Sequence, residues 1–126
     1  MKNVVDSSGW LEYFADGPHA GAFSEPLLDL PALVVPTITI YEVFKIVLRQ
    51  RGEDAAFQAA ALMQQGNLVG LSPSLAMLAA KTSLALSLPM ADSIILETAR
   101  QYDAVLWTQD EHFSDIESVR YFRHGG

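Results

Sequence analysis

The sequence predicts an α/β fold, namely a three-layer α/β/α sandwich with a mainly parallel central sheet. Short apolar runs alternate with longer segments of helical periodicity, which is typical of parallel strands covered by helices on both faces. Half of the 126 residues are hydrophobic, which is enough to bury one core. The length leaves no room for a second core, so we expect a single domain over residues 1–126.

The first half of the chain is expected to hold two strands and four helices between turn-forming residues. Asp16-Gly17-Pro18 ends one helix, Pro36-Thr37 opens the longest one, and Gly52 ends it, because glycine and proline interrupt regular structure. The expected strands span residues 3–5 and 33–35, and the expected helices span residues 10–14, 19–28, 37–51 and 53–65.

The second half continues the alternation of strands and helices. Ser72-Pro73 opens one helix and Pro89 another, since proline suits the first turn of a helix. The expected helices span residues 73–86 and 89–102, and the expected strands span residues 68–71, 104–107 and 119–122.

Charge and composition exclude several kinds of site. The chain has no cysteine, so disulfides and thiolate metal sites are absent, and any metal must be held by oxygen or imidazole. A net charge of −7 disfavours binding nucleic acid through its phosphates alone, unless a divalent cation lies between protein and substrate. His19, His112 and His124 have no partner at a spacing typical of metal ligands, so we expect them at the surface.

The location of the protein is also predicted from sequence. The first residues reach Asp6 after only two apolar positions, which is unlike a signal peptide. The most apolar window, residues 75–90, contains Lys81 and Pro89 and is too short for a membrane span. We therefore expect a cytoplasmic protein with no membrane contact.

Three acidic residues follow predicted strands. Asp6 comes directly after the first strand, Asp110 follows the strand at 104–107, and Glu42 lies in the opening turns of the helix after the strand at 33–35. Because ligands of parallel sheets bind beyond the carboxyl ends of the strands, these acids are expected to meet at one edge.

Asp92 is a fourth candidate, for a different reason. At 100° per residue it falls on the same helix face as Ile95 and Tyr102, whereas Ser93 and Glu97 fall on the opposite face, with Arg100 and Gln101. We therefore expect Asp92 to point inward and the opposite face to be solvated. An inward carboxylate needs a cation or hydrogen-bond donors.

Each acid also has a purely structural interpretation. Asp6 and Asp110 precede helices, where aspartate is most often an N-cap, and Asp92 is an N-cap if its helix begins late. Glu42 has the spacing for an i,i+3 ion pair with Lys45. Only the convergence of all four acids favours a functional site.

The chain resembles a PIN domain of the VapC-type toxin group over essentially its full length. The resemblance rests on four stretches: Val4-Val5-Asp6-Ser7-Ser8 with Trp10-Leu11, Thr39-Ile40-Tyr41-Glu42-Val43, Leu88-Pro89-Met90-Ala91-Asp92-Ser93-Ile94-Ile95, and Leu106-Trp107-Thr108-Gln109-Asp110-Glu111-His112-Phe113. The chain departs from the common pattern at Ser93, where many members have alanine, and at Trp107, where many have a smaller or β-branched residue.

The resemblance implies an endoribonuclease that depends on Mg²⁺ or Mn²⁺ and acts as the toxin of a bacterial toxin–antitoxin pair. It implies Asp6 and Asp92 as direct metal ligands, and Glu42 and Asp110 as ligands that bind directly or through water. We expect Ser7 and Thr108 to orient a carboxylate or a water. The candidate RNA contacts are Lys45 and Arg49, with Arg51 and Arg100 as further basic residues.

The implied partners are an RNA substrate, a cognate antitoxin and a second copy of the chain. We expect the antitoxin to place an arginine or lysine near the four acids, because a guanidinium matches carboxylates bidentately. Two alternatives stay open: a PIN-like module that binds a partner without catalysis, and a phosphoacceptor receiver-like domain. The receiver fits poorly, since it would show paired acids after the first strand and a lysine after the last main strand.

Overall fold

The computed structural model describes residues 1–125, so Gly126, the last residue of the expected domain, lies outside it. Within that range the strands β1 (Lys2–Val5), β4 (Ala104–Thr108) and β5 (Val119–Tyr121) form a parallel sheet in the order β1-β4-β5. A second parallel pair, β2 (Val34–Pro36) and β3 (Asn67–Val69), is joined to β1 by a bridge between Asn3 and Leu33. The expected parallel sheet is confirmed.

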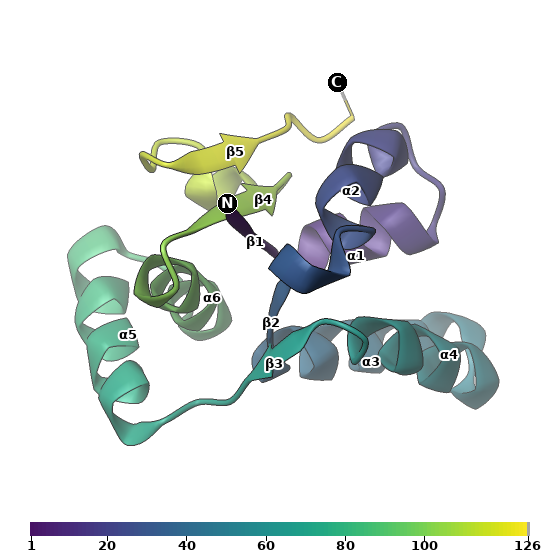
Figure 1. Cartoon of the computed structure of the whole chain (residues 1–126), viewed down its shortest axis with the longest axis horizontal. Helices are drawn as coiled ribbons and strands as arrows, with labels where there is room; N and C mark the ends of the chain where they lie inside the picture. Colours follow the sequence, from purple (N-terminus) through teal and green to yellow (C-terminus); the bar gives the residue numbers. More distant parts are fainter. Residues whose placement is uncertain (126) are drawn as a thin grey trace.

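Helices flank this sheet, as Figure 1 shows. The α-helices of residues 1–125 are α1 (Ser7–Phe14), α2 (Ala20–Leu27), α3 (Thr37–Arg51), α4 (Glu53–Met63), α5 (Pro73–Leu86) and α6 (Met90–Gln101). Two short 3₁₀ turns, η1 (Leu30–Ala32) and η2 (Glu111–Phe113), were not expected from the sequence. The other elements match the expectation within a few residues; α1 begins earlier because Asp6 caps it.

The two faces of the sheet carry separate cores. Neighbouring strand residues point to opposite faces, so Val5, Val35 and Trp107 join one buried cluster, which includes Trp10 and Phe23 of α1 and α2. Val4, Val34 and Leu106 join the other cluster, which includes Ile95, Leu96 and Ala99 of α6. Figure 1 accordingly shows α1 and α2 on one side of β1 and β4, and α6 with α5 on the other side.

The expected solvated face of α6 is only partly solvated. Arg100 and Gln101 are exposed, but Ser93 and Glu97 are buried. They are buried because α5 packs along this side of α6, where the Thr82 hydroxyl donates a 2.6 Å hydrogen bond to the Glu97 carboxylate. The periodicity therefore predicted the inner face of α6 but not the second helix layer that covers its outer face.

No single helix among residues 1–125 is long and apolar enough to cross a membrane. Only α5 and α6 taken together reach the length and apolar character of a span, and they are bent by 115° relative to each other.

Candidate metal centre

The carboxyl ends of the parallel strands bring acidic residues to one edge of the sheet. Asp6 follows β1 and its backbone N–H donates a 3.1 Å hydrogen bond to the carbonyl of Trp107 on β4, so the two strand ends lie side by side. Asp110 follows β4, and Glu42 lies in α3, which begins directly after β2. The sheet topology therefore gathers the three acids that the sequence placed after strands.

Asp6 is almost fully buried, with 2% of its surface exposed. Its Oδ1 accepts hydrogen bonds from the Gly9 backbone N–H (3.0 Å) and the Ser8 hydroxyl (2.7 Å), and its Oδ2 accepts one from the Thr108 hydroxyl (2.6 Å). The bond to Gly9 makes Asp6 the N-cap of α1. The cap interpretation is thus correct, but it leaves the position of Asp6 beside the other acids unexplained.

The electrostatics of Asp6 are unfavourable for a carboxylate. Burial raises the pKa of Asp6 to about 7, against the hydrogen bonds from Thr108, Ser8 and Gly9, which lower it, while the negative charge of Asp110 raises it further. All three donors are neutral groups. Metal-free Asp6 is therefore held at a place that disfavours its charged form.

Asp92 lies in the first turn of α6, whose N-cap is Pro89, so the alternative interpretation of Asp92 as an N-cap is wrong. Its side chain is 13% exposed, and its Oδ2 lies 2.8 Å from Nδ1 of His112. The same Nδ1 lies 3.2 Å from Oδ1 of Asp110. Asp92, Asp110 and His112 each offer one ligand atom, and these atoms lie within 4.8 Å of one another.

Charge coupling joins the four acids into one site. Burial raises the pKa of Asp92, and the charges of Asp110 and Glu42 raise it further, although His112 lowers it. The pKa of His112 is raised, first by its hydrogen bond to Asp92 and then by the charge of Asp110. Repulsion between the acids contributes to the raised pKa values of Asp6 and Asp92, but burial is the larger cause.

Glu42 is held from the other side of the site. Its Oε1 accepts a 2.6 Å hydrogen bond from the Ser7 hydroxyl, which is adjacent in sequence to Asp6. The alternative pair of Glu42 with Lys45 does not form among the described residues, because the Lys45 ammonium lies over the Tyr41 ring instead, 5.6 Å from its centroid. Lys45 and Arg49 are both exposed on α3.

Asp110 has a structural contact as well as its place among the acids. Its Oδ1 accepts a 2.9 Å hydrogen bond from the His112 backbone N–H, so it caps η2 as the cap interpretation predicted. Its own backbone N–H donates to the Thr108 hydroxyl (2.9 Å), which in turn donates to Asp6. Thr108 thereby fixes the spacing between the ends of β1 and β4.

Two members of this site were not predicted. Ser8 donates to Asp6 and accepts a 3.1 Å hydrogen bond from the Gln109 backbone N–H. His112 was expected at the surface without a partner; it is exposed, but it bridges Asp92 and Asp110. Its position two residues after Asp110 was visible in the sequence, but only folding brings α6 beside η2.

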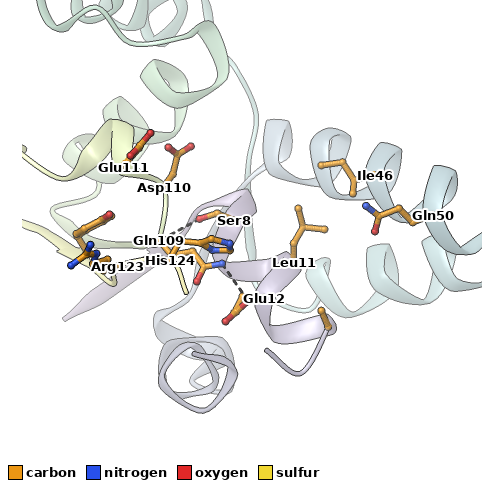
Figure 2. Close-up of a pocket in the computed structure, with 12 residues that line it drawn as sticks. Ser8, Leu11, Glu12, Ile46, Gln50, Gln109, Asp110, Glu111, Arg123 and His124 are labelled. Atoms are coloured by element: carbon orange, nitrogen blue, oxygen red, sulfur yellow. Dashed lines mark hydrogen bonds between the residues drawn. The ribbon is translucent and has the colours of Figure 1, made fainter. Parts of the chain in front are cut away.

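A cavity of about 760 Å³ opens beside Asp110 and Ser8. Figure 2 shows Gln109 and Glu12 in its wall, joined by a hydrogen bond of 3.3 Å, with Arg123 and His124 from the end of the chain. Leu11, Ile46 and Gln50 line its other side, between α1 and α3. The cavity therefore leads from the acids toward an apolar surface and carries one cation, Arg123, that the sequence did not single out.

The residues present fit a hard divalent cation. The donor set consists of carboxylate oxygens and one imidazole nitrogen, and oxygen donors are those that Mg²⁺ and Mn²⁺ prefer. Within residues 1–125 no lysine or arginine forms an ion pair with any of the four acids. The negative charge of the site is thus left for a bound cation to neutralise.

Comparison with known proteins identifies the family. The model of the PIN domain matches residues 4–119. The chain belongs to the PIN domain family. The receiver-like alternative is therefore wrong.

Solved structures show the same PIN fold at low sequence identity. The chain aligns with a toxin–antitoxin complex from Klebsiella pneumoniae at 22% identity and a TM-score of 0.77, covering 94% of this chain and 95% of that one. It aligns with the sarcin-ricin loop cleaving toxin VapC20 from Mycobacterium tuberculosis at 18% identity and a TM-score of 0.79, covering 94% and 98%. It aligns with DNA-bound VapBC from Salmonella typhimurium at 13% identity and a TM-score of 0.74, covering 97% of each chain. No curated protein matches the sequence.

Proposed function

We propose that this PIN domain is an endoribonuclease that depends on Mg²⁺ or Mn²⁺ and uses Asp6, Glu42, Asp92 and Asp110. The observation that carries the proposal is the convergence of four acids from separate elements, one of them almost fully buried, with no lysine or arginine paired to them in residues 1–125. Burying carboxylates together is costly, and a bound cation removes that cost.

The hydrogen bonds suggest how Asp6 takes part. A carboxylate oxygen has two lone pairs, and Oδ1 of Asp6 already accepts from Gly9 and Ser8. Oδ2 accepts only from Thr108 and keeps one lone pair for the cation or its water. Thr108 and Ser7 then orient Asp6 and Glu42, the role expected of them.

A bound divalent cation would lower the pKa of a water and stabilise the negative charge that develops on the phosphate. The protein's own part is to hold the acids at fixed positions and to bind RNA around them. Lys45 and Arg49 on α3, and Arg123 in the cavity beside Asp110, are the cations we assign to the RNA backbone.

The test is a cleavage assay on the purified chain. EDTA-treated protein should leave a labelled RNA intact, and added Mg²⁺ or Mn²⁺ should restore internal cleavage. Failure of both ions would contradict the proposed activity and favour the non-catalytic partner-binding alternative.

We further propose that the protein is a toxin held inactive by an antitoxin. Similar folds have been solved as a toxin–antitoxin complex and as DNA-bound VapBC. A second cavity of about 240 Å³ between α1, α3 and α4 shares Leu11, Ala15 and Gln50 with the cavity beside the acids. An antitoxin segment lying along both cavities would place an arginine or lysine beside Asp110.

Co-expression with the product of the adjacent gene tests the antitoxin. We expect the two proteins to co-purify and the complex to cleave RNA more slowly than the free chain. A complex that cleaves as fast as the free protein would leave a PIN nuclease without the toxin role.

We also propose a homodimer through the outer face of α5. Met77 and Leu84 are 65% and 87% exposed there, and Leu78 and Leu86 are exposed beside them. Exposed apolar patches of this kind mark protein contacts. Sedimentation of Leu84→Glu should give a monomer where the wild type gives a dimer; a monomeric wild type would contradict the proposal.

A further inference from the structure

His112 lies where a cation between two of the acids would have its ligands. Its Nδ1 is 2.8 Å from Asp92 Oδ2 and 3.2 Å from Asp110 Oδ1, although its side chain is 51% exposed. Asp92 belongs to α6 and Asp110 follows β4, so the histidine joins carboxylates from two separate elements.

The 2.8 Å separation is a hydrogen bond in the metal-free chain, and both separations also match those of neighbouring ligands on one ion. Octahedral sites with bonds of about 2.1 Å place adjacent ligand atoms about 3.0 Å apart. The two distances in the structure, 2.8 and 3.2 Å, lie on either side of that value. Asp92, Asp110 and His112 would hold a cation between them, since their ligand atoms all lie within 4.8 Å of one another.

The local backbone holds the imidazole in this position. His112 is the middle residue of η2, and its backbone N–H donates a 2.9 Å hydrogen bond to the carboxylate of Asp110. The next residue, Phe113, is fully buried in the core cluster under α6. Asp110 and His112 are thus carried by one anchored turn, and the ring faces α6 and Asp92.

We propose that His112 is a nitrogen ligand of the divalent cation, so that the centre is a mixed nitrogen and oxygen site that prefers Mn²⁺ to Mg²⁺. The proton that Nδ1 donates to Asp92 in the metal-free chain would leave that nitrogen on binding, and the exposed ring would keep a proton only on Nε2. This inference rests on the proposed function, which assigns the acids to that cation. Both ions prefer oxygen donors, but Mn²⁺ accepts an imidazole nitrogen more readily than Mg²⁺, which favours oxygen ligands and water. A nitrogen in the ligand set therefore favours the transition metal.

Electron spin echo spectroscopy of bound Mn²⁺ tests the bond directly. Metal-stripped wild-type protein with one equivalent of Mn²⁺ should show echo modulation from a coordinated ¹⁴N. Protein labelled with ¹⁵N only at histidine should show the ¹⁵N pattern instead. This labelled wild type identifies the nitrogen as histidine without depending on the folding of any variant.

Substitutions identify which histidine is bound. His112→Gln should lose the nitrogen modulation, whereas the matched control His124→Gln, another exposed histidine near the site, should keep it. Titration should show that His112→Gln weakens Mn²⁺ binding on the order of tenfold or more, with a much smaller change for Mg²⁺.

The outcomes separate this inference from the proposed function. Mn²⁺ that binds the wild type without histidine modulation would overturn the role of His112 and leave the acidic centre intact. Equal losses of Mn²⁺ and Mg²⁺ affinity in His112→Gln would overturn the preference. Wild-type protein that binds neither ion would overturn the metal centre itself, and the proposed function with it.

Discussion

Two of the buried carboxylates, Glu97 and Asp6, lie in different parts of this molecule and are compensated in different ways. Glu97 on α6 is 9% exposed, accepts a hydrogen bond from Thr82 on α5, and forms an ion pair of 2.9 Å with Arg100 one turn away. Asp6 is 2% exposed and receives hydrogen bonds only from neutral groups, while Asp110 adds a like charge.

The two acids differ in whether a cation accompanies them within the fold. A buried charge is tolerated when a cation and donors accompany it. Glu97 has a donor in Thr82 of α5 and a cation in Arg100 of α6. Asp6 has donors without a cation, as buried Glu12 also has, but Asp6 lies beside a second negative charge, that of Asp110. That crowding of acids is the arrangement expected where the cation comes from solution.

The largest expected effect is the loss of RNA cleavage in Asp92→Asn. The change removes a negative ligand oxygen at nearly constant volume, so we expect a folded protein whose cleavage rate falls roughly a hundredfold or more. Asp115→Asn is the matched control, because it removes an equal charge from an exposed position outside the cluster. Cleavage by Asp92→Asn at the rate of Asp115→Asn would remove Asp92 from the site.

The second expected effect is a loss of stability of the metal-free protein as the pH rises from 5 to 8. The pKa of Asp6 is about 7 in the folded chain against 3.8 for the free group, so between these values the folded state holds a proton that the unfolded state has released. Stability from this group is therefore present at low pH and is lost on the order of a few kcal/mol as the pH approaches 7.

The other shifted groups act in the same direction. The raised pKa of Asp92 also favours the folded state at lower pH. The raised pKa of His112 likewise favours the folded state until the pH exceeds the pKa of the folded histidine. Melting temperatures in EDTA should therefore fall from pH 5 to pH 8.

Asp6→Asn is the control for that pH dependence. It should flatten the profile, raise the melting temperature at pH 8, and weaken the stabilisation that Mg²⁺ gives the wild type. If Asp6 acted only as a cap, the substitution would be neutral or destabilising with and without the ion.

A smaller effect is expected at Glu97. Glu97→Gln keeps an acceptor for Thr82 but loses the ion pair with Arg100, whose side chain is half exposed. We expect a destabilisation of about 0.5–1 kcal/mol in urea unfolding, with unchanged Mg²⁺ affinity and RNA cleavage. A loss of metal affinity would show that Glu97 and Asp6 are not energetically independent.

The sequence predicted much of this arrangement because strand ends can be read locally. Asp6 and Asp110 follow apolar strands, and Glu42 follows Pro36-Thr37, so parallel topology alone places them at one edge. The inward face of α6 likewise follows from helical periodicity.

The features that the sequence did not predict depend on contacts between distant segments. The burial of Ser93 and Glu97 comes from α5 packing over α6, and a single helix has no signal for a second layer. The contact of His112 with Asp92 joins residues twenty positions apart on two elements whose relative placement is set by the core.

The smallest expected effect, that of Ser93→Ala, tests how the effect of Asp92→Asn is to be interpreted. Ser93 neighbours Asp92 on α6, but its buried hydroxyl donates a 2.7 Å hydrogen bond to the Met90 carbonyl within the same helix. Ser93→Ala removes that bond while improving helix propensity, so stability should change by less than about 0.5 kcal/mol and cleavage should stay at the wild-type rate. If Ser93→Ala instead lost cleavage as Asp92→Asn does, the start of α6 would be the sensitive feature. The loss of cleavage in Asp92→Asn would then be explained by a displaced start of α6, and not by the loss of a carboxylate ligand. The reason is that Ser93→Ala, which removes no carboxylate, would have caused the same loss.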